Sequence, residues 1–202
     1  MQADVNVACK RLSLVGEWDN STVMVRAFVA LELPVEIRDQ LKGVQEKLRQ
    51  CSARLTFVEP ALIHITLKFL GEVAEKDLPR VSDALRNVPF RQFPVTVGTV
   101  TVNNLKRPHT VWCSITDGGE AKKLFSQVEE VLTPLGFEQE TRLFTPHATL
   151  ARVKTPDPSL FPVLRAMEGT TFGDCMIQGM KLKKSILTPQ GPVYKDLMEV
   201  VW

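Results

Sequence analysis

The chain carries one short pattern twice, as HITL at residues 64–67 and as HATL at residues 147–150. It has three histidines, and two of them lie in these copies. Side chains two apart on a β-strand point to the same face, so each copy aims an imidazole and a hydroxyl the same way. If the two strands face each other, one cleft holds two imidazoles and two hydroxyls. Such a set suits metal-free acid–base chemistry on a phosphate ester.

Each residue type has a task in cleaving a phosphate ester. A base must take a proton from the attacking water, and an acid must give one to the departing oxygen on the opposite side of phosphorus. Histidine titrates near neutral pH, so His64 and His147 can share these tasks, and the residues alone leave open which does which. The hydroxyls of Thr66 and Thr149 can donate hydrogen bonds to the non-bridging phosphate oxygens. A lone His-x-Thr is common in sheets, and it is the repetition that favours a function.

A cationic side chain follows each copy and is a candidate for phosphate binding. Lys68 shares the face of His64 if the strand alternates strictly, although a solvated lysine at a strand end is the plain alternative. Arg152 lies five residues after His147, so only a bulge would return it to the cleft. The third histidine, His109, stands in an expected hairpin loop and is predicted to be exposed and non-catalytic.

Composition indicates an ordinary globular chain of 202 residues, with 44% apolar and 24% charged residues. Charges interrupt every apolar run well before the length of a membrane span. The net charge of +2 does not argue for nucleic acid, but an enzyme that grips only an RNA end needs no broad basic face. The four cysteines are scattered without a CxxC pair, which predicts reduced thiols in a cytoplasmic protein and no zinc site.

The first residues differ from the rest of the chain. Residues 1–23 lack a comparable apolar pattern and are interpreted as an N-terminal extension outside the core, and residues 24–202 as a single domain. An extra strand around residues 12–15 is the alternative.

Apolar periodicity predicts strands and helices in alternation. The expected helices span 35–50, 75–88 and 120–135. The expected strands span 25–33, 55–58, 63–70 (ended by Gly71), 93–102, 110–115, 147–153, 176–187 and 194–201. This order predicts an α+β fold with mostly antiparallel pairing and an internal pseudo-repeat, in which each half gives one His-x-Thr strand to a central cleft.

Four segments resemble the two-histidine phosphoesterase superfamily, and within it the RNA 2′,3′-cyclic phosphodiesterases, also called 2′-5′ RNA ligases. They read RAFVA at 26–30, HITLKFLGE at 64–72, PHATLARV at 146–153 and LKKSILTPQGPVY at 182–194. The resemblance runs from about residue 24 to the C-terminus. One departure is Ala148, where a larger aliphatic residue is more usual; it is expected to point into the core.

The resemblance implies a bilobal, pseudo-twofold fold of two mostly antiparallel sheets flanked by helices. It implies hydrolysis of a terminal 2′,3′-cyclic phosphate, on RNA 3′ ends or cyclic nucleotides, to a 2′-phosphomonoester, without metal or other cofactor. His147 is then the general base and His64 the general acid, with Arg152 in the site. Phe28 and Tyr194 are candidates for nucleobase or ribose contact, with core packing as the alternative for either. A monomer with no membrane association is expected.

Three other functions stay open. A metal enzyme would use His64, His147 and a carboxylate such as Glu72 as ligands. A non-catalytic module of the same fold would only hold a nucleotide. Ligation of 2′-5′ RNA ends would use the same residues, with a 5′ hydroxyl in place of water.

Overall fold

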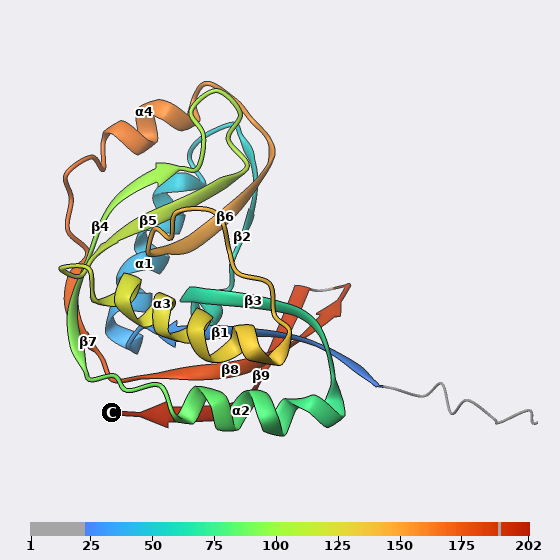
Figure 1. Cartoon of the computed structure of the whole chain (residues 1–202). Helices are drawn as coiled ribbons and strands as arrows, with labels where there is room; N and C mark the ends of the chain where they lie inside the picture. The colour runs from blue at the N-terminus through green and yellow to red at the C-terminus, as the bar shows by residue number, and fades with distance from the viewer. Residues whose placement is uncertain (1–22, 190) are drawn as a thin grey trace, which may run out of the picture.

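The computed structural model describes residues 23–189 and 191–202 (Figure 1). Its helices are α1 (Val35–Leu48), α2 (Leu78–Arg86), α3 (Glu120–Leu132) and α4 (Leu160–Arg165). Its strands are β1 (Met24–Glu32), β2 (Arg54–Phe57), β3 (His64–Ala74), β4 (Phe93–Val102), β5 (Thr110–Thr116), β6 (His147–Thr155), β7 (Gly173–Ile177), β8 (Gly179–Thr188) and β9 (Gly191–Val201). The expected extension at residues 1–23 lies almost wholly outside the described residues. No helix in the described part of the chain is long and apolar enough to cross a membrane.

The strands form two antiparallel halves that meet in the middle of the molecule. One half runs β3-β1-β8-β9 and the other β7-β4-β5-β6, with β2 added beside β6. The halves are joined where β3 meets β6, through the single pair Ile65–Ala148. This is the predicted α+β fold with two lobes, and Figure 1 shows the lobes as the upper and lower parts of the molecule.

Each of two helices leaves the lobe of the strand that precedes it and packs on the other lobe. Helix α1 follows β1 but packs against β6, β7 and α4, whereas α3 follows β5 but packs against β3 and α2. Both helices are amphipathic, with buried residues three or four apart along one face. In α1 these include Ile37, Leu41, Val44 and Leu48, and in α3 Ala121, Leu124, Val128 and Leu132. The crossed helices tie the two lobes together.

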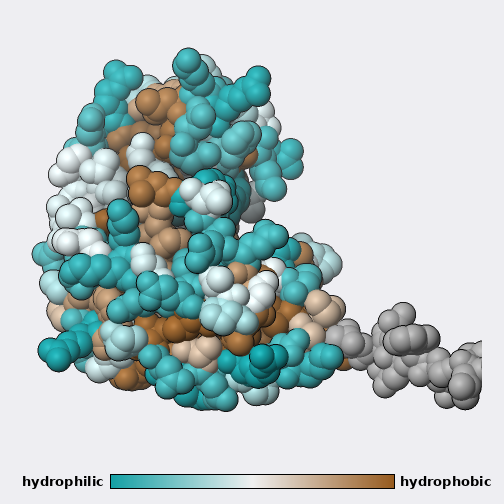
Figure 2. All heavy atoms as spheres, in the orientation of Figure 1, coloured by the Kyte–Doolittle hydropathy of each residue, from teal (hydrophilic) through white to brown (hydrophobic). Residues whose placement is uncertain are grey.

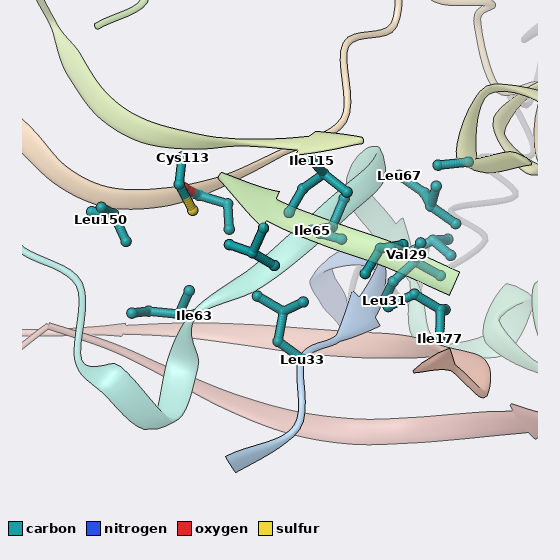
Figure 3. Packing of buried hydrophobic residues seen from close by; sticks show 14 of the residues in the cluster. Val29, Leu31, Leu33, Ile63, Ile65, Leu67, Cys113, Ile115, Leu150 and Ile177 are labelled. Atoms are coloured by element: carbon teal, nitrogen blue, oxygen red, sulfur yellow. The ribbon is translucent and has the colours of Figure 1, made fainter. Parts of the chain in front are cut away.

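One apolar core runs through both lobes. Leu31 and Ile65 come from the first lobe and Cys113 and Leu150 from the second, and all are fully buried in the same cluster (Figure 3). A close-packed core shared by both lobes leaves little freedom for one lobe to move against the other. The two His-x-Thr strands are therefore held in a fixed relation.

Two expected strand limits are wrong. The strand expected at 176–187 is two strands: β7 pairs with β4 in one lobe and β8 pairs with β1 in the other. Local apolar pattern is alike on both sides of the break, so periodicity could not reveal a change of lobe. Strand β3 also continues past Gly71, which takes a φ of 72° and sits at a bulge against β1, a conformation that glycine adopts without strain.

Candidate active site

The two motifs lie side by side at the junction of the lobes. Because Ile65 pairs with Ala148 in an antiparallel register, His64 is level with Thr149, and Thr66 with His147. Ile65 and Ala148 are fully buried, whereas the two histidines and two threonines are partly exposed on the opposite side. We call the side that carries these four residues the open face. The space-filling view shows the outline notched between the lobes (Figure 2).

Both imidazoles are oriented by the same backbone contact. Nδ1 of His64 lies 2.7 Å from the carbonyl oxygen of Leu62, and Nδ1 of His147 lies 2.8 Å from that of Thr145. A carbonyl oxygen can only accept, so Nδ1 carries the hydrogen in both rings and Nε2 is the nitrogen that titrates. Nε2 of His64 lies 3.0 Å from Oγ1 of Thr66. Each copy therefore holds its histidine as one defined tautomer.

Burial lowers the pKa of both histidines below the ordinary value. For His64, the bond to the Leu62 carbonyl acts against this, and the positive charge of Lys183 adds to it. For His147, the bond to the Thr145 carbonyl opposes the shift and the charge of Arg152 reinforces it. The charge of His147 also contributes to lowering the pKa of His64, because the two rings are near enough to repel when both are protonated.

The strand bulge that Arg152 needs is present. Opposite β5, the register of β6 shifts by one residue between Thr149 and Ala151, so Arg152 returns to the open face. Its guanidinium donates to Oγ1 of Thr110 at 2.8 Å. The positive charge of Arg152 adds to the lowering of the pKa of His147 that burial causes.

Lys68 does not reach the open face, and the expectation that it shares the face of His64 is wrong. Strand β3 has the same bulge as β6, located between Thr66 and Lys68 opposite β1, and the extra residue turns Lys68 toward the helices. Its ammonium pairs with Glu129 of α3 at 2.6 Å and donates to the Glu138 carbonyl at 2.7 Å. Lys68 is 7% exposed, so it is a structural residue here.

Aromatic rings surround His64. Phe28 stacks on the imidazole with ring centroids 5.1 Å apart, and Tyr194 meets it edge-on at 5.6 Å. Phe28 is only 3% exposed, so it packs beneath the imidazole and has no free face for a nucleobase. Tyr194 is half-buried and stays a candidate for ribose or base contact. For Phe28 the packing alternative fits the structure.

A family model described as LigT like Phosphoesterase matches residues 31–112 and 116–194, which include both His-x-Thr copies. The chain belongs to this family.

The similarity between this LigT-like phosphoesterase and the following relatives extends over nearly the whole length of each relative. A protein of Archaeoglobus fulgidus named RNA 2′,3′-cyclic phosphodiesterase is 37% identical over 174 residues, covering 86% of this chain and 98% of the relative. One of Aeropyrum pernix with the same name is 35% identical, covering 80% and 94%. A solved Thermus thermophilus protein has a TM-score of 0.74 at 28% identity, covering 87% and 97%. The apo structure of Escherichia coli LigT shares the fold, with a TM-score of 0.71 at 21% identity, covering 88% and 97%.

The LigT-like site has two aromatic residues that sequence reasoning missed. The indole of Trp112 lies 3.9 Å from the His147 ring, centroid to centroid. Phe69 lies on the open face with its ring 6.1 Å from that of Phe28. The available signal for Phe69 was its position after the motif, which corresponds to that of Arg152. For Trp112, the pairing of β5 with β6 had to be known.

Charged residues beside the LigT-like site are mostly paired with one another. Lys183 is buried and pairs with Glu32 and Asp196, each at 2.6 Å, so its charge is largely balanced. His109 is exposed in the β4–β5 loop, as predicted. Over residues 23–189 and 191–202, no three side chains of His, Cys, Asp or Glu come together as a metal site. The ligand set of the metal alternative, with Glu72 as third ligand, is thus not assembled there.

Proposed function

We propose that this LigT-like phosphoesterase hydrolyses the 2′,3′-cyclic phosphate at an RNA 3′ end to a 2′-phosphomonoester, without a metal. The observation that carries the proposal is the Ile65–Ala148 pair, since it aligns two His-x-Thr motifs on one face. The names of relatives that match over most of both chains support the same activity. A protein of this fold that only held a nucleotide could tolerate the loss of either histidine. This chain has both, which supports catalysis over simple binding.

In the proposed reaction, His147 acts as the base and His64 as the acid. Nε2 of His147 takes a proton from water as its oxygen bonds to phosphorus, and the bond from phosphorus to the ribose 3′ oxygen breaks. Nε2 of His64 gives a proton to that oxygen, which leaves the phosphate on the 2′ oxygen. Each proton transfer of this kind typically contributes about 10²–10⁴-fold to the rate. The bonds at Nδ1 make Nε2 the transferring nitrogen of both rings, and in His64 the ribose oxygen replaces the contact of Nε2 with Oγ1 of Thr66.

Thr66, Thr149 and Arg152 are the proposed phosphate-binding residues. The hydroxyls lie level with the opposite histidines, so they can donate to the non-bridging oxygens as the histidines act on the bridging ones. Arg152 adds a positive charge from the second lobe. Hydrogen bonds to an ionised group are stronger than neutral ones, which suits a charge that redistributes in the transition state. Lys68 has no part in this set.

The proposed setting is a monomer in the cytoplasm. Cys51, Cys113 and Cys175 are free thiols, as a reducing compartment requires. Burial raises the pKa of the Cys113 thiol to about 12, which makes it unreactive.

The deciding experiment offers an oligonucleotide that ends in a 2′,3′-cyclic phosphate, in the presence of a chelator, and identifies the product isomer. We expect the product to be a 2′-phosphomonoester, and we expect the rate with chelator to equal the rate without it. A 3′-phosphomonoester would show that the 2′ oxygen is the leaving group and would contradict the proposed reaction. Binding without turnover would favour the nucleotide-holding module, and a rate abolished by chelator and restored by one metal would favour the metal enzyme.

A further inference from the structure

Each of the two crossed helices carries a polar side chain inside its buried apolar face. In α1 this residue is Gln45, which is 2% exposed, and in α3 it is Glu129, which is 6% exposed. Both stand directly after a buried valine and three residues before a buried leucine, so they occupy the same place in the two helices. A buried polar group destabilises a fold unless it is hydrogen-bonded, so the partner of each group indicates what it does.

The partner of Gln45 lies at the bulge of the second motif strand. The register of β6 against β5 passes from Thr149 directly to Ala151, so Leu150 is the extra residue of the bulge. Nε2 of Gln45 donates to the Leu150 carbonyl at 3.0 Å and to the Val58 carbonyl at 2.7 Å. The Val58 amide also donates to the Leu150 carbonyl, at 2.9 Å. Gln45 therefore ties helix α1 and the residue that follows β2 to the bulge of β6.

The first lobe has a matching contact. The register of β3 against β1 skips Leu67, and the next residue, Lys68, pairs with Glu129 of α3. In both lobes, a helix that follows a strand of the other lobe thus places its buried polar group at the bulge of the motif strand. The contact runs from a neutral amide to the backbone in one lobe, and it is an ion pair between side chains in the other. Because the contact recurs with different chemistry, the bulge is the feature that both groups stabilise.

The bulge in β6 determines the direction of Arg152. Side chains alternate along a strand, so a residue five positions after His147 faces away from it when the strand is regular. The extra residue reverses that alternation and brings Arg152 to the open face, where its guanidinium donates to Thr110. A β6 strand without the bulge would turn Arg152 toward the side on which α1 packs, and would present Ala151 to the phosphate instead.

We infer that Gln45 is a positioning residue for phosphate binding, because its amide stabilises the β6 bulge that keeps Arg152 on the open face. The inference rests on the proposed function, in which Arg152 contacts the phosphate, and deepens it by linking that contact to a helix on the opposite side of the sheet. Leu150 is fully buried, so Gln45 lies on the core side of the strand. It acts on the site only through the backbone of β6.

The test measures the affinity for inorganic phosphate by calorimetry in the wild type, Gln45→Met, Arg152→Ala and the double variant. Gln45→Met keeps the length of the side chain and removes both donated hydrogen bonds. We expect it to weaken phosphate binding about 10-fold when Arg152 is present and less than about 2-fold when Arg152 is absent, because both changes remove the same charge-assisted contact. Equal weakening in both backgrounds, or an affinity of Gln45→Met within about 2-fold of the wild type, would overturn the inference.

Kinetics on a dinucleotide with a 2′,3′-cyclic phosphate end supply a readout that a general loss of stability does not move. In Gln45→Met we expect KM to rise about 10-fold and kcat to change less than about 3-fold, because phosphate binding is lost while both histidines remain. Val44→Ala is the matched control, since Val44 neighbours Gln45 on the buried face of α1 and its truncation removes packing but no hydrogen bond. It should lower the melting temperature and leave the phosphate affinity at the wild-type value.

Gln45→Glu covers the case in which Gln45→Met does not fold. Its carboxyl group keeps the shape of the amide and can donate one hydrogen bond when it is protonated, whereas the ionised carboxylate donates none. We expect the phosphate affinity of this variant, relative to the wild type at the same pH, to fall as the pH rises. A ratio that stays constant with pH would overturn the inference.

Failure of the inference differs from failure of the proposed function. If the wild-type protein opens no cyclic phosphate, the proposed function is wrong, and the phosphate affinities still test the link between Gln45 and Arg152. If the wild-type protein opens the cyclic phosphate and Gln45→Met binds phosphate as the wild type does, the proposed function stands and the positioning role of Gln45 is wrong.

Discussion

Each histidine of the pair is fixed at Nδ1 by a carbonyl two residues before it, and this contact leaves Nε2 as the only nitrogen that can exchange a proton with substrate. We expect His64→Ala or His147→Ala to lower kcat by about 10²–10⁴-fold, since no other residue supplies the lost proton transfer. The double variant should be little worse than the worse single one, because the two act as a unit. Single-turnover rates on a cyclic-phosphate dinucleotide measure this.

The control for that prediction is His109→Ala, which removes the exposed histidine of the β4–β5 loop and should leave kcat unchanged. Near-normal turnover in His147→Ala would show that another group acts as the base.

The pH dependence follows from burial of both rings. The profile of kcat/KM reports the pKa values of the free enzyme, and both histidines have a pKa lowered by burial and by a neighbouring cation. We expect a bell with its maximum below about pH 6.5, the ordinary histidine value. The kcat profile should lie at higher pH, since a bound phosphate favours the protonated imidazole. A kcat/KM maximum at pH 7.5 or above would contradict this account.

The free energy of unfolding should also depend on pH, in the range between the lowered pKa values of the two histidines and the ordinary histidine value. A histidine with a folded-state pKa below its unfolded value binds protons more readily when unfolded, so the free energy of unfolding rises with pH through that window. We expect the stabilising contribution to be complete above the unfolded pKa and to be lost as the pH falls. Melting temperatures of wild-type and His64→Ala proteins between pH 5 and 8 measure it, and a wild-type curve that rises toward pH 5 would oppose it.

At the scale of elements, one bulge in each motif strand decides which cation reaches the site. The bulge in β6 brings Arg152 to the open face, and the matching bulge in β3 sends Lys68 into the contact between β3 and α3. The basic residues stand at different distances from their histidines, four for Lys68 and five for Arg152. With the same bulge in both strands, only the residue at the fifth position after the histidine reaches the open face.

The Lys68–Glu129 pair gives a prediction of stability. Lys68→Ala leaves the Glu129 carboxylate buried without its partner, and we expect a loss of about 3–5 kcal/mol in the free energy of unfolding. The double variant Lys68→Met, Glu129→Leu should recover most of that loss, because apolar replacement of a buried pair is often neutral. Urea unfolding of the singles and the double measures both effects.

An exposed pair provides the comparison for Lys68. Lys123 pairs with Glu120 on the surface of α3, and Lys123→Ala should cost less than about 1 kcal/mol. A rise in KM for Lys68→Ala, without a loss of stability, would instead return Lys68 to the phosphate site.

At the scale of the whole molecule, the two lobes share one core and exchange helices, so the domain of residues 24–202 should fold without the segment before it. We expect a chain that starts at Met24 to keep its activity. The Val23 carbonyl accepts a hydrogen bond from the Glu75 amide, so the loss of stability should be small, about 1 kcal/mol. Cyclic phosphodiesterase activity and melting temperature of the truncated chain measure this. An insoluble or inactive product would mean that residues 1–23 complete the domain.

The sequence by itself determined what depends on neighbours along the chain. Because side chains two apart on a strand share a face, the sequence predicted that His64 lies beside Thr66 and His147 beside Thr149. The helical period predicted α1, α2 and α3 to within a few residues at each end. The repeat also indicated two halves around one site. Each of these follows from local backbone geometry, which the residue pattern reports directly.

The tertiary structure alone decided which strands pair and in which register. Pairing between distant segments produced the bulges that turn Arg152 toward the open face and Lys68 toward α3. It also placed Trp112 against His147. It also divided residues 173–188 between two lobes, buried Phe28 and left Phe69 exposed. These outcomes depend on hydrogen bonds and packing between residues far apart in the chain, and a bulge of one residue is enough to reverse the face to which a side chain points.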